Sequence, residues 1–172
     1  MIVLDGPIGD PDESDAVFCR DVVAALSRYT ARELLVCVTS CGGNGGEGEA
    51  IVDALRRDGR PVVTRIRRIA ASAGAFIAMA GDRIEIEADA FLMLHGTVCF
   101  APGDGLALGV AAEVVDEMNA TVARQMARLS GRSFDTELAR LNASDDLWFN
   151  ADEALREGYV HAIVAPMQRG GR

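Results

Sequence analysis

The chain has little of several residue types that mark particular protein classes. Only two of its 172 residues are histidine, aromatic residues make up 5%, and 17 basic residues face 26 acidic ones, for a net charge of −9. That balance argues against binding to nucleic acid or to an anionic membrane. No apolar run approaches the roughly 18 residues that span a bilayer, and the N-terminus lacks the pattern of a signal peptide. We therefore expect a cytoplasmic protein with no nucleic-acid or membrane partner.

Cysteine is sparse, and its spacing is not that of a metal site. The four cysteines lack the close pairs of a zinc site, and the two histidines are far apart in sequence, so we expect no metal and no cofactor. Buried free thiols are the expected state, because disulfides are rare in the cytosol. Cys41 is the exception, since it lies in a glycine-rich segment. As a nucleophile it would need His95 as its base.

The apolar pattern predicts one α/β domain over residues 1–165 and a tail over 166–172. Short apolar runs alternate with stretches whose apolar residues recur every three or four positions, an order that implies parallel strands joined by right-handed crossovers. Strands are expected at Ile2–Leu4, Leu34–Val38, Pro61–Ile66, Ile84–Ile86, Phe91–Leu94 and Tyr159–Val164. Helices are expected from a cap at Asp12 or Ser14 to Tyr29, and at about Glu47–Asp58, Ser72–Ala80, Leu108–Leu129, Ser133–Leu141 and Asn150–Glu157.

Ser72 and His95 are the strongest candidates for chemistry. Ser72 lies in Ala71-Ser72-Ala73-Gly74, where small neighbours leave room for a substrate backbone, and His95 closes a short apolar strand. A serine becomes a nucleophile when a base, most often histidine, takes its proton. The structural alternative is that Ser72 caps a helix and His95 fills a gap in the core.

A glycine-rich segment, Ser40-Cys41-Gly42-Gly43-Asn44-Gly45-Gly46, follows the second strand, and no regular structure is expected in it. It lacks the Lys-Ser/Thr of a P-loop and the spacing of a dinucleotide-binding motif. Backbone N–H groups of a Gly42-Gly43 turn and of Ala73 are suited to an oxyanion, and a plain strand-to-helix turn is the alternative. A Ser-His mechanism also needs a carboxylate that orients the imidazole. The sequence leaves five candidates open for it: Asp82, Asp89, Asp104, Asp145 and Asp146.

These motifs, in this order, resemble the ClpP family of serine peptidases, which has the crotonase-like fold. The resemblance rests on Ser40-Cys41-Gly42-Gly43, Ala70-Ala71-Ser72-Ala73-Gly74-Ala75, Met93-Leu94-His95 and the stretch Asp146–His161. It implies an α/β superhelix of β-β-α units with a protruding handle helix at Leu108–Leu129. It also implies a triad of Ser72, His95 and Asp146, with Gly43 and Ala73 as the oxyanion donors.

The resemblance further implies a serine endopeptidase that cleaves peptides or unfolded proteins through an acyl-enzyme, inside a homo-oligomeric ring or stacked rings. An ATPase partner is less expected, because the chain starts at the first core strand, without the family's axial loops. Gly6-Pro7-Ile8-Gly9 and Ile77–Asp82 most closely resemble the ClpP-related head-maturation proteases of phages and prophages. Two alternatives stay open: a catalytically silent ClpP-like assembly or regulatory subunit, and a crotonase-type acyl-CoA enzyme, which the triad disfavours.

Overall fold

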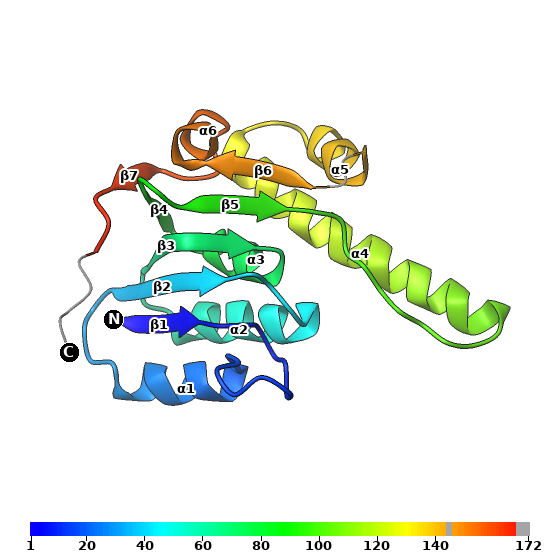
Figure 1. The fold of residues 1–172 in the computed structure, drawn as a ribbon, viewed down its shortest axis with the longest axis horizontal. Coiled ribbons are helices and arrows are strands. Elements are labelled where there is room, and N and C mark those ends of the chain that lie inside the picture. The colour runs from blue at the N-terminus through cyan, green and yellow to red at the C-terminus, as the bar shows by residue number, and fades with distance from the viewer. Residues whose placement is uncertain (144–145, 168–172) are drawn as a thin grey trace. The chain divides into compact units, whose positions relative to one another are not determined.

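A parallel sheet is the centre of the computed structural model, which describes residues 1–143 and 146–167 (Figure 1). Its strand order is β1 (Ile2–Asp5), β2 (Leu34–Ser40), β3 (Val62–Ala71), β4 (Arg83–Glu87) and β7 (Ala162–Val164). The four pairings along this path are parallel, as predicted. The strand β5 (Phe91–Leu94) pairs with the end of β3, and β6 (Leu147–Asn150), which the sequence did not predict, pairs with β5.

The chain divides into two compact units. The first comprises residues 1–93 and the chain from Trp148 onward, and the second comprises residues 94–147. The first contains α1 (Cys19–Arg28), α2 (Gly45–Asp58), α3 (Ala73–Ala78) and α6 (Ala151–Arg156); the second contains α4 (Gly105–Ser130) and α5 (Phe134–Ala143), which pack together. The single domain over 1–165 stays a prediction, and most of the predicted tail, from residue 168 on, lies outside the described residues.

Several of the predicted element boundaries are wrong, and for three of them the structure shows the reason. The helix α1 begins at Cys19 and has no side-chain cap, because the Glu47 carboxylate of α2 accepts the Cys19 N–H at 2.5 Å. The helix α2 begins at Gly45, since the Asn44 side chain accepts the Glu47 N–H at 2.9 Å and so caps it. The last strand is only Ala162–Val164. The buried residues before it, which the prediction included in the strand, belong instead to the turn that ends α6.

A bulge divides β3 into two halves with different partners. The pairing with β2 shifts from Val38–Ile66 to Ser40–Ala70, and Arg68, between them, has φ 58°. The first half of β3 pairs with β4 and the second half pairs with β5. Bulges redirect a strand in this way, and they are frequent beside active sites. Here the bulge aims the end of β3 toward β5 and away from β4.

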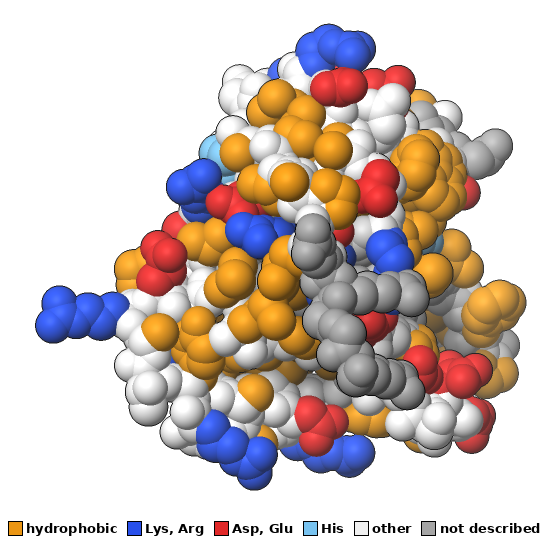
Figure 2. Space-filling view, turned by 60° about the vertical axis from the view of Figure 1, so that its left-hand side comes forward, with side chains coloured by type: hydrophobic (Ala, Val, Ile, Leu, Met, Phe, Trp, Pro, Cys, Tyr) orange, Lys and Arg blue, Asp and Glu red, His pale blue; other side chains and the backbone are white. Residues whose placement is uncertain are grey.

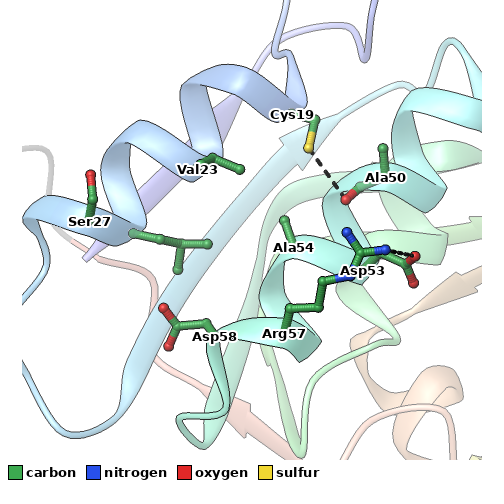
Figure 3. Close-up of a pocket in the computed structure, with 9 residues that line it drawn as sticks. Cys19, Val23, Ser27, Ala50, Asp53, Ala54, Arg57 and Asp58 are labelled. Carbon is green, nitrogen blue, oxygen red and sulfur yellow. Dashed lines mark hydrogen bonds and ion pairs between the residues drawn. The ribbon is translucent and has the colours of Figure 1, made fainter.

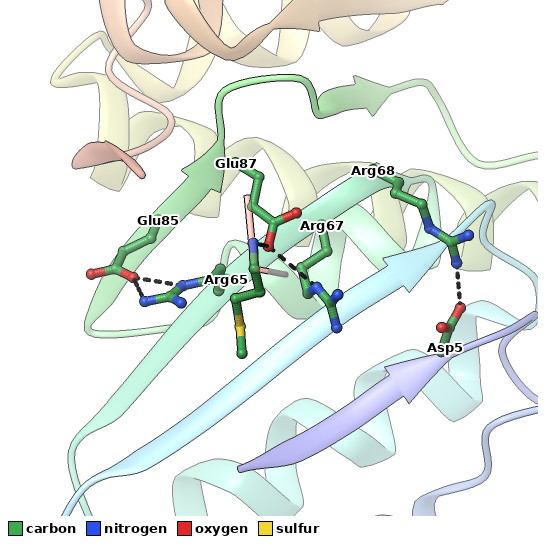
Figure 4. A network of polar contacts seen from close by, with 7 residues as sticks. Asp5, Arg65, Arg67, Arg68, Glu85 and Glu87 are labelled. Carbon is green, nitrogen blue, oxygen red and sulfur yellow. Dashed lines mark hydrogen bonds and ion pairs between the residues drawn. The ribbon is translucent and has the colours of Figure 1, made fainter. Parts of the chain in front are cut away.

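Ion pairs line one face of β3 and β4 (Figure 4). Arg65 contacts Glu85 at 2.6 Å, and Arg67 contacts Glu87 at 3.2 Å. Glu87 also accepts the backbone N–H of Met167 at 3.0 Å. Both glutamates are nearly buried, and a buried carboxylate is tolerated only when it is paired in this way. On the face drawn in Figure 2, acidic and basic side chains stand beside one another, so the excess of acidic residues forms no continuous patch there.

The long helix α4 differs in character along its length. Its first three turns are largely exposed, and its buried residues all lie in the second half: Asn119, Ala123, Gln125 and Met126. The helix begins three residues before the predicted Leu108, and two of its buried side chains are amides, those of Asn119 and Gln125. Within the described part of the chain, no helix is long and apolar enough to cross a membrane.

Replacing Arg60 by glutamine should weaken the first unit in a pH-dependent way. The Arg60 guanidinium donates to the carbonyls of Leu26 and Tyr29 at the end of α1, and to Asp58. Its hydrogen bond with Asp58 lowers the pKa of that carboxyl. Such a carboxyl stabilises the fold above its unfolded pKa of about 4, and the contribution is lost as the pH falls through the folded value. The stability difference between Arg60→Gln and the wild type should therefore be largest near neutral pH and shrink below about pH 4.

Urea unfolding at several pH values measures this difference. Arg57→Gln is the matched control, because its ion pair with Asp53 on the same helix is exposed and such pairs contribute only about 0.3–0.5 kcal/mol. The loss of unfolding free energy in Arg60→Gln, relative to the wild type, could prove independent of pH or no larger than the loss in Arg57→Gln. Either result would refute a stabilising ion pair between Arg60 and Asp58.

Candidate functional site

Ser72 lies at the junction between the end of β3 and the start of α3, and it is half-buried. Its backbone is unusual for a residue with a side chain, with φ 53° and ψ −124°. The Ser72 N–H donates to the Met93 carbonyl of β5 at 3.1 Å, and the Ser72 carbonyl accepts from Phe76 at 3.0 Å. These bonds hold Ser72 in a conformation that costs of order 1–3 kcal/mol. Strain of this kind is typical of a residue whose side chain must be presented in one direction.

Small residues let the chain around Ser72 pack very closely. A Cβ added to Gly74 would lie 2.8 Å from the Cβ of Ser40, so the first turn of α3 rests directly on the end of β2. A Cβ added to Gly42 would lie 2.6 Å from the Cβ of Ser72 and 3.1 Å from its Oγ. The glycine-rich turn therefore lies against the Ser72 side chain.

Backbone hydrogen bonds fix the Gly42-Gly43 turn on both sides of Gly43. The Gly42 carbonyl accepts the Ile8 N–H at 2.8 Å, and the Asn44 N–H donates to the Ile8 carbonyl at 2.8 Å. The Gly42 N–H donates to the Ser40 Oγ at 3.1 Å. Gly42 and Gly43 have φ angles of 106° and 139°, which only glycine adopts easily.

The backbone N–H groups of Gly43 and Ala73 have no hydrogen-bond acceptor among the residues that the structure describes. A paired donor cannot stabilise a new anion, whereas an unpaired and rigidly held N–H is suited to it. Ser72, Gly43 and Ala73, all predicted site residues, thus come together within the first unit.

His95 and Asp146 both belong to the second unit. His95 directly follows β5 and is half-buried, and Asp146 is exposed and directly precedes β6. Two other carboxylate candidates have structural roles: Asp82 accepts the Val62 N–H at 2.8 Å, and Asp104 caps α4. A fourth candidate, Asp145, lies outside the described residues.

The structure also places the possible metal ligands and the four thiols. Within the described ranges, no three His, Cys, Asp or Glu side chains gather as metal ligands. Cys41 and Cys99 are exposed free thiols, so the expectation of burial was wrong for Cys99. Cys37 is buried, and burial raises the pKa of its thiol, which makes the reactive thiolate rarer.

A groove of about 540 Å³ runs between α1 and α2, apart from the serine site (Figure 3). Cys19 lies at one end and donates to the Ala50 carbonyl at 3.4 Å. Burial, and then the charge of Glu47, raise the pKa of the Cys19 thiol. A thiol that resists ionisation is a poor nucleophile, so this groove does not compete with Ser72 as a reaction centre.

The Clp protease family model matches residues 1–167. The chain belongs to the Clp protease family. Its relatives include the ATP-dependent Clp protease proteolytic subunit of Pleurastrum terricola, with 30% identity over 96% of this chain and 83% of that protein. Proteolytic subunit 1 of Mycobacterium tuberculosis is 26% identical over 89% of this chain and 76% of that protein. The predicted class, a ClpP-like serine peptidase, is thereby confirmed at the level of the family.

Among solved structures, a point mutant of ClpP1 from Listeria monocytogenes superimposes with a TM-score of 0.80 and 20% identity, and the match covers 95% of this chain and 90% of that one. The predicted ClpP-like, crotonase-type fold is confirmed. Sequence reasoning placed Ile8 and Ser40 within motifs but assigned neither a role, and the structure shows that both hold the Gly42-Gly43 turn through hydrogen bonds.

Proposed function

We propose that the chain is a serine endopeptidase that cleaves peptide bonds through an acyl-enzyme on Ser72. His95 takes the hydroxyl proton as Ser72 Oγ attacks the carbonyl carbon, and Asp146 orients the imidazole. The N–H groups of Gly43 and Ala73 bind the resulting oxyanion. The same proton then passes to the leaving amine as the C–N bond breaks, and water hydrolyses the ester by the reverse sequence of transfers.

The observation that carries this proposal is the pair of unpartnered N–H groups beside a strained serine. The neighbouring donors of the turn, those of Gly42 and Asn44, are both occupied, so Gly43 is singled out by the hydrogen-bond pattern itself. One such donor is worth roughly 3 kcal/mol of transition-state stabilisation. Ala73 is the first residue of α3, where an unpaired N–H is usual, so its part in the proposal rests on its place directly after Ser72.

The connectivity of the chain supports His95 and Asp146 as the other two residues of the proposed catalytic triad. The Met93 carbonyl accepts the Ser72 N–H, and His95 comes two residues after Met93. Because two residues span at most about 7 Å, the His95 backbone lies within about that distance of Met93. The arrows of β5 and β6 run in opposite directions in Figure 1. The chain after β5 and the chain before β6 therefore leave the sheet at the same end. His95 and Asp146 are the residues at those two positions.

The proposal includes peptides or unfolded proteins as substrates and a cytoplasmic homo-oligomer as the active form. Exposed apolar residues on the first turns of α4 support self-assembly through this helix: Leu106, Leu108, Val110 and Val114. The sequences Gly6-Pro7-Ile8-Gly9 and Ile77–Asp82 support a relationship to the head-maturation branch of phages and prophages.

Labelling with a fluorophosphonate probe, followed by peptide mass spectrometry, tests the proposal. The wild type should form an adduct on Ser72, Ser72→Ala should form none, and His95→Ala should react far more slowly. Ser27→Ala is the matched control, because Ser27 is an exposed serine of α1 and should not affect labelling. A folded, oligomeric wild type that forms no adduct would favour a catalytically silent subunit instead.

A further inference from the structure

Asn119 is a buried amide in the second half of α4, with both ends of its side chain in use. It is 8% exposed. Its Oδ1 accepts the backbone N–H of Thr97 at 2.7 Å, and its Nδ2 donates to the Asn142 Oδ1 at 3.3 Å. A single side chain thus joins the segment after β5 to the last turn of α5, and all three residues lie within the second unit.

Asn119 joins the segment that carries His95 to the end of α5, which comes before Asp146 in the chain. Thr97 follows His95 by two residues, and Asn142 precedes Asp146 by four. Gly96, between His95 and Thr97, lies close to the same contact, since a Cβ added to it would be 3.6 Å from the Leu141 carbonyl and 3.8 Å from the Asn119 Nδ2. The backbone that follows the candidate base is therefore held between α4 and α5.

This contact is important because no helix or strand holds that backbone. Residues 95–104 lie between β5 and α4 without regular secondary structure. A backbone N–H that is bound by a buried amide keeps its place, whereas an unbound loop can shift by an ångström or more. A misplacement of that size at a reacting group costs on the order of 100-fold in rate.

We infer that Asn119 is a positioning residue for the peptidase reaction. It holds the chain after His95 against the end of α5, and so keeps the backbone of the base in one fixed position. It does not touch the substrate. The inference rests on the proposed function, because it assigns Asn119 a role only in a reaction that uses His95 and Asp146.

Peptide-hydrolysis kinetics of Asn119→Leu test the inference. Leucine is similar in size to asparagine and makes neither hydrogen bond, so kcat should fall about 30–100-fold, with KM within about twofold of the wild type. Asn119→Asp should restore kcat to within about threefold. Its carboxylate still accepts the Thr97 N–H, and the exposed Asn142 amide can rotate to donate its NH₂ group.

Gln125→Leu is the matched control on the same helix. Gln125 is 5% exposed, and neither polar atom of its side chain has a partner among the described residues. The change of amide to leucine is the same, but no hydrogen bond is lost, so kcat should not change. If buried amides in α4 had only a structural role, Asn119→Leu and Gln125→Leu should lower kcat by similar factors.

The outcomes separate the inference from the proposed function. If wild-type turnover does not depend on Ser72, the proposed function fails, whatever Asn119 does. If turnover depends on Ser72 and Asn119→Leu keeps the wild-type kcat, or Gln125→Leu loses as much, the inference alone is overturned. Should Asn119→Leu not fold, Asn142→Ala removes only the second hydrogen bond at an exposed residue, and it should lower kcat severalfold with KM unchanged. An unchanged kcat in that variant also overturns the inference.

Discussion

Ser72→Gly is expected to abolish peptide hydrolysis and yet to give a more stable protein than Ser72→Ala. Both variants lose the hydroxyl and should lose about 10⁴–10⁶-fold in kcat, as expected when an attacking serine is removed. They differ only in backbone preference. Ser72 has φ 53° and ψ −124°, a region that strains any residue with a Cβ and that glycine adopts freely.

The difference in stability between the two variants measures how much strain the site stores. The free energy of unfolding of Ser72→Gly should be about 1–2 kcal/mol higher than that of Ser72→Ala. For a chain of this length, this corresponds to a few degrees in Tm. Thermal and urea unfolding, at equal protein concentration because assembly also affects Tm, would provide the value. Equal stability of the two variants would show that the Ser72 backbone is not strained in solution. If either variant hydrolysed peptides at the wild-type rate, Ser72 would not be the nucleophile.

The sequence predicted most elements because their signals are local. Leu34–Val38 is a continuous apolar run, and Asn150 with Glu153 forms a capping box, which needs only residues three apart. The start of α1 could not be predicted, because its first N–H is satisfied by Glu47 of another helix. The strand β6 was missed for a similar reason: a four-residue segment becomes a strand through its pairing with β5, and its own pattern is too short to indicate one.

The candidate site shows the same division between local and tertiary information. Ser72 and Gly43 stand out in the sequence through their small neighbours. The bulge at Arg68, which aims β3 toward β5, leaves no pattern that a single sequence displays, because it arises from a shift in pairing with β2. Ile8 likewise holds the Gly42-Gly43 turn through backbone groups, which every residue type possesses. Residue identity at these positions therefore says little about their role.

Gly43→Ala is expected to disable the enzyme while Ser72 itself stays intact. A Cβ on Gly43 would lie 2.3 Å from the Ile8 carbonyl oxygen and 2.9 Å from the Ile8 nitrogen, so the turn must move away from Ile8. That movement takes the Gly43 N–H out of place, and losing one oxyanion donor costs about 10²–10³-fold in kcat. Because Gly43 has φ 139°, alanine would also strain the backbone there, and some loss of stability should accompany the loss of rate.

Gly46→Ala, in the first turn of α2, is the matched control for this prediction. Its nearest contact is the Asn44 side chain at an ordinary 3.4 Å, so both kcat and Tm should stay close to the wild type. Steady-state hydrolysis of a peptide substrate would measure the rate. A peptide aldehyde, which forms a tetrahedral adduct with serine, should lose affinity for Gly43→Ala by a similar factor, because the adduct needs the same donor. If Gly43→Ala lowered Tm but kept kcat and aldehyde affinity, Gly43 would be a structural residue of the turn and not an oxyanion donor.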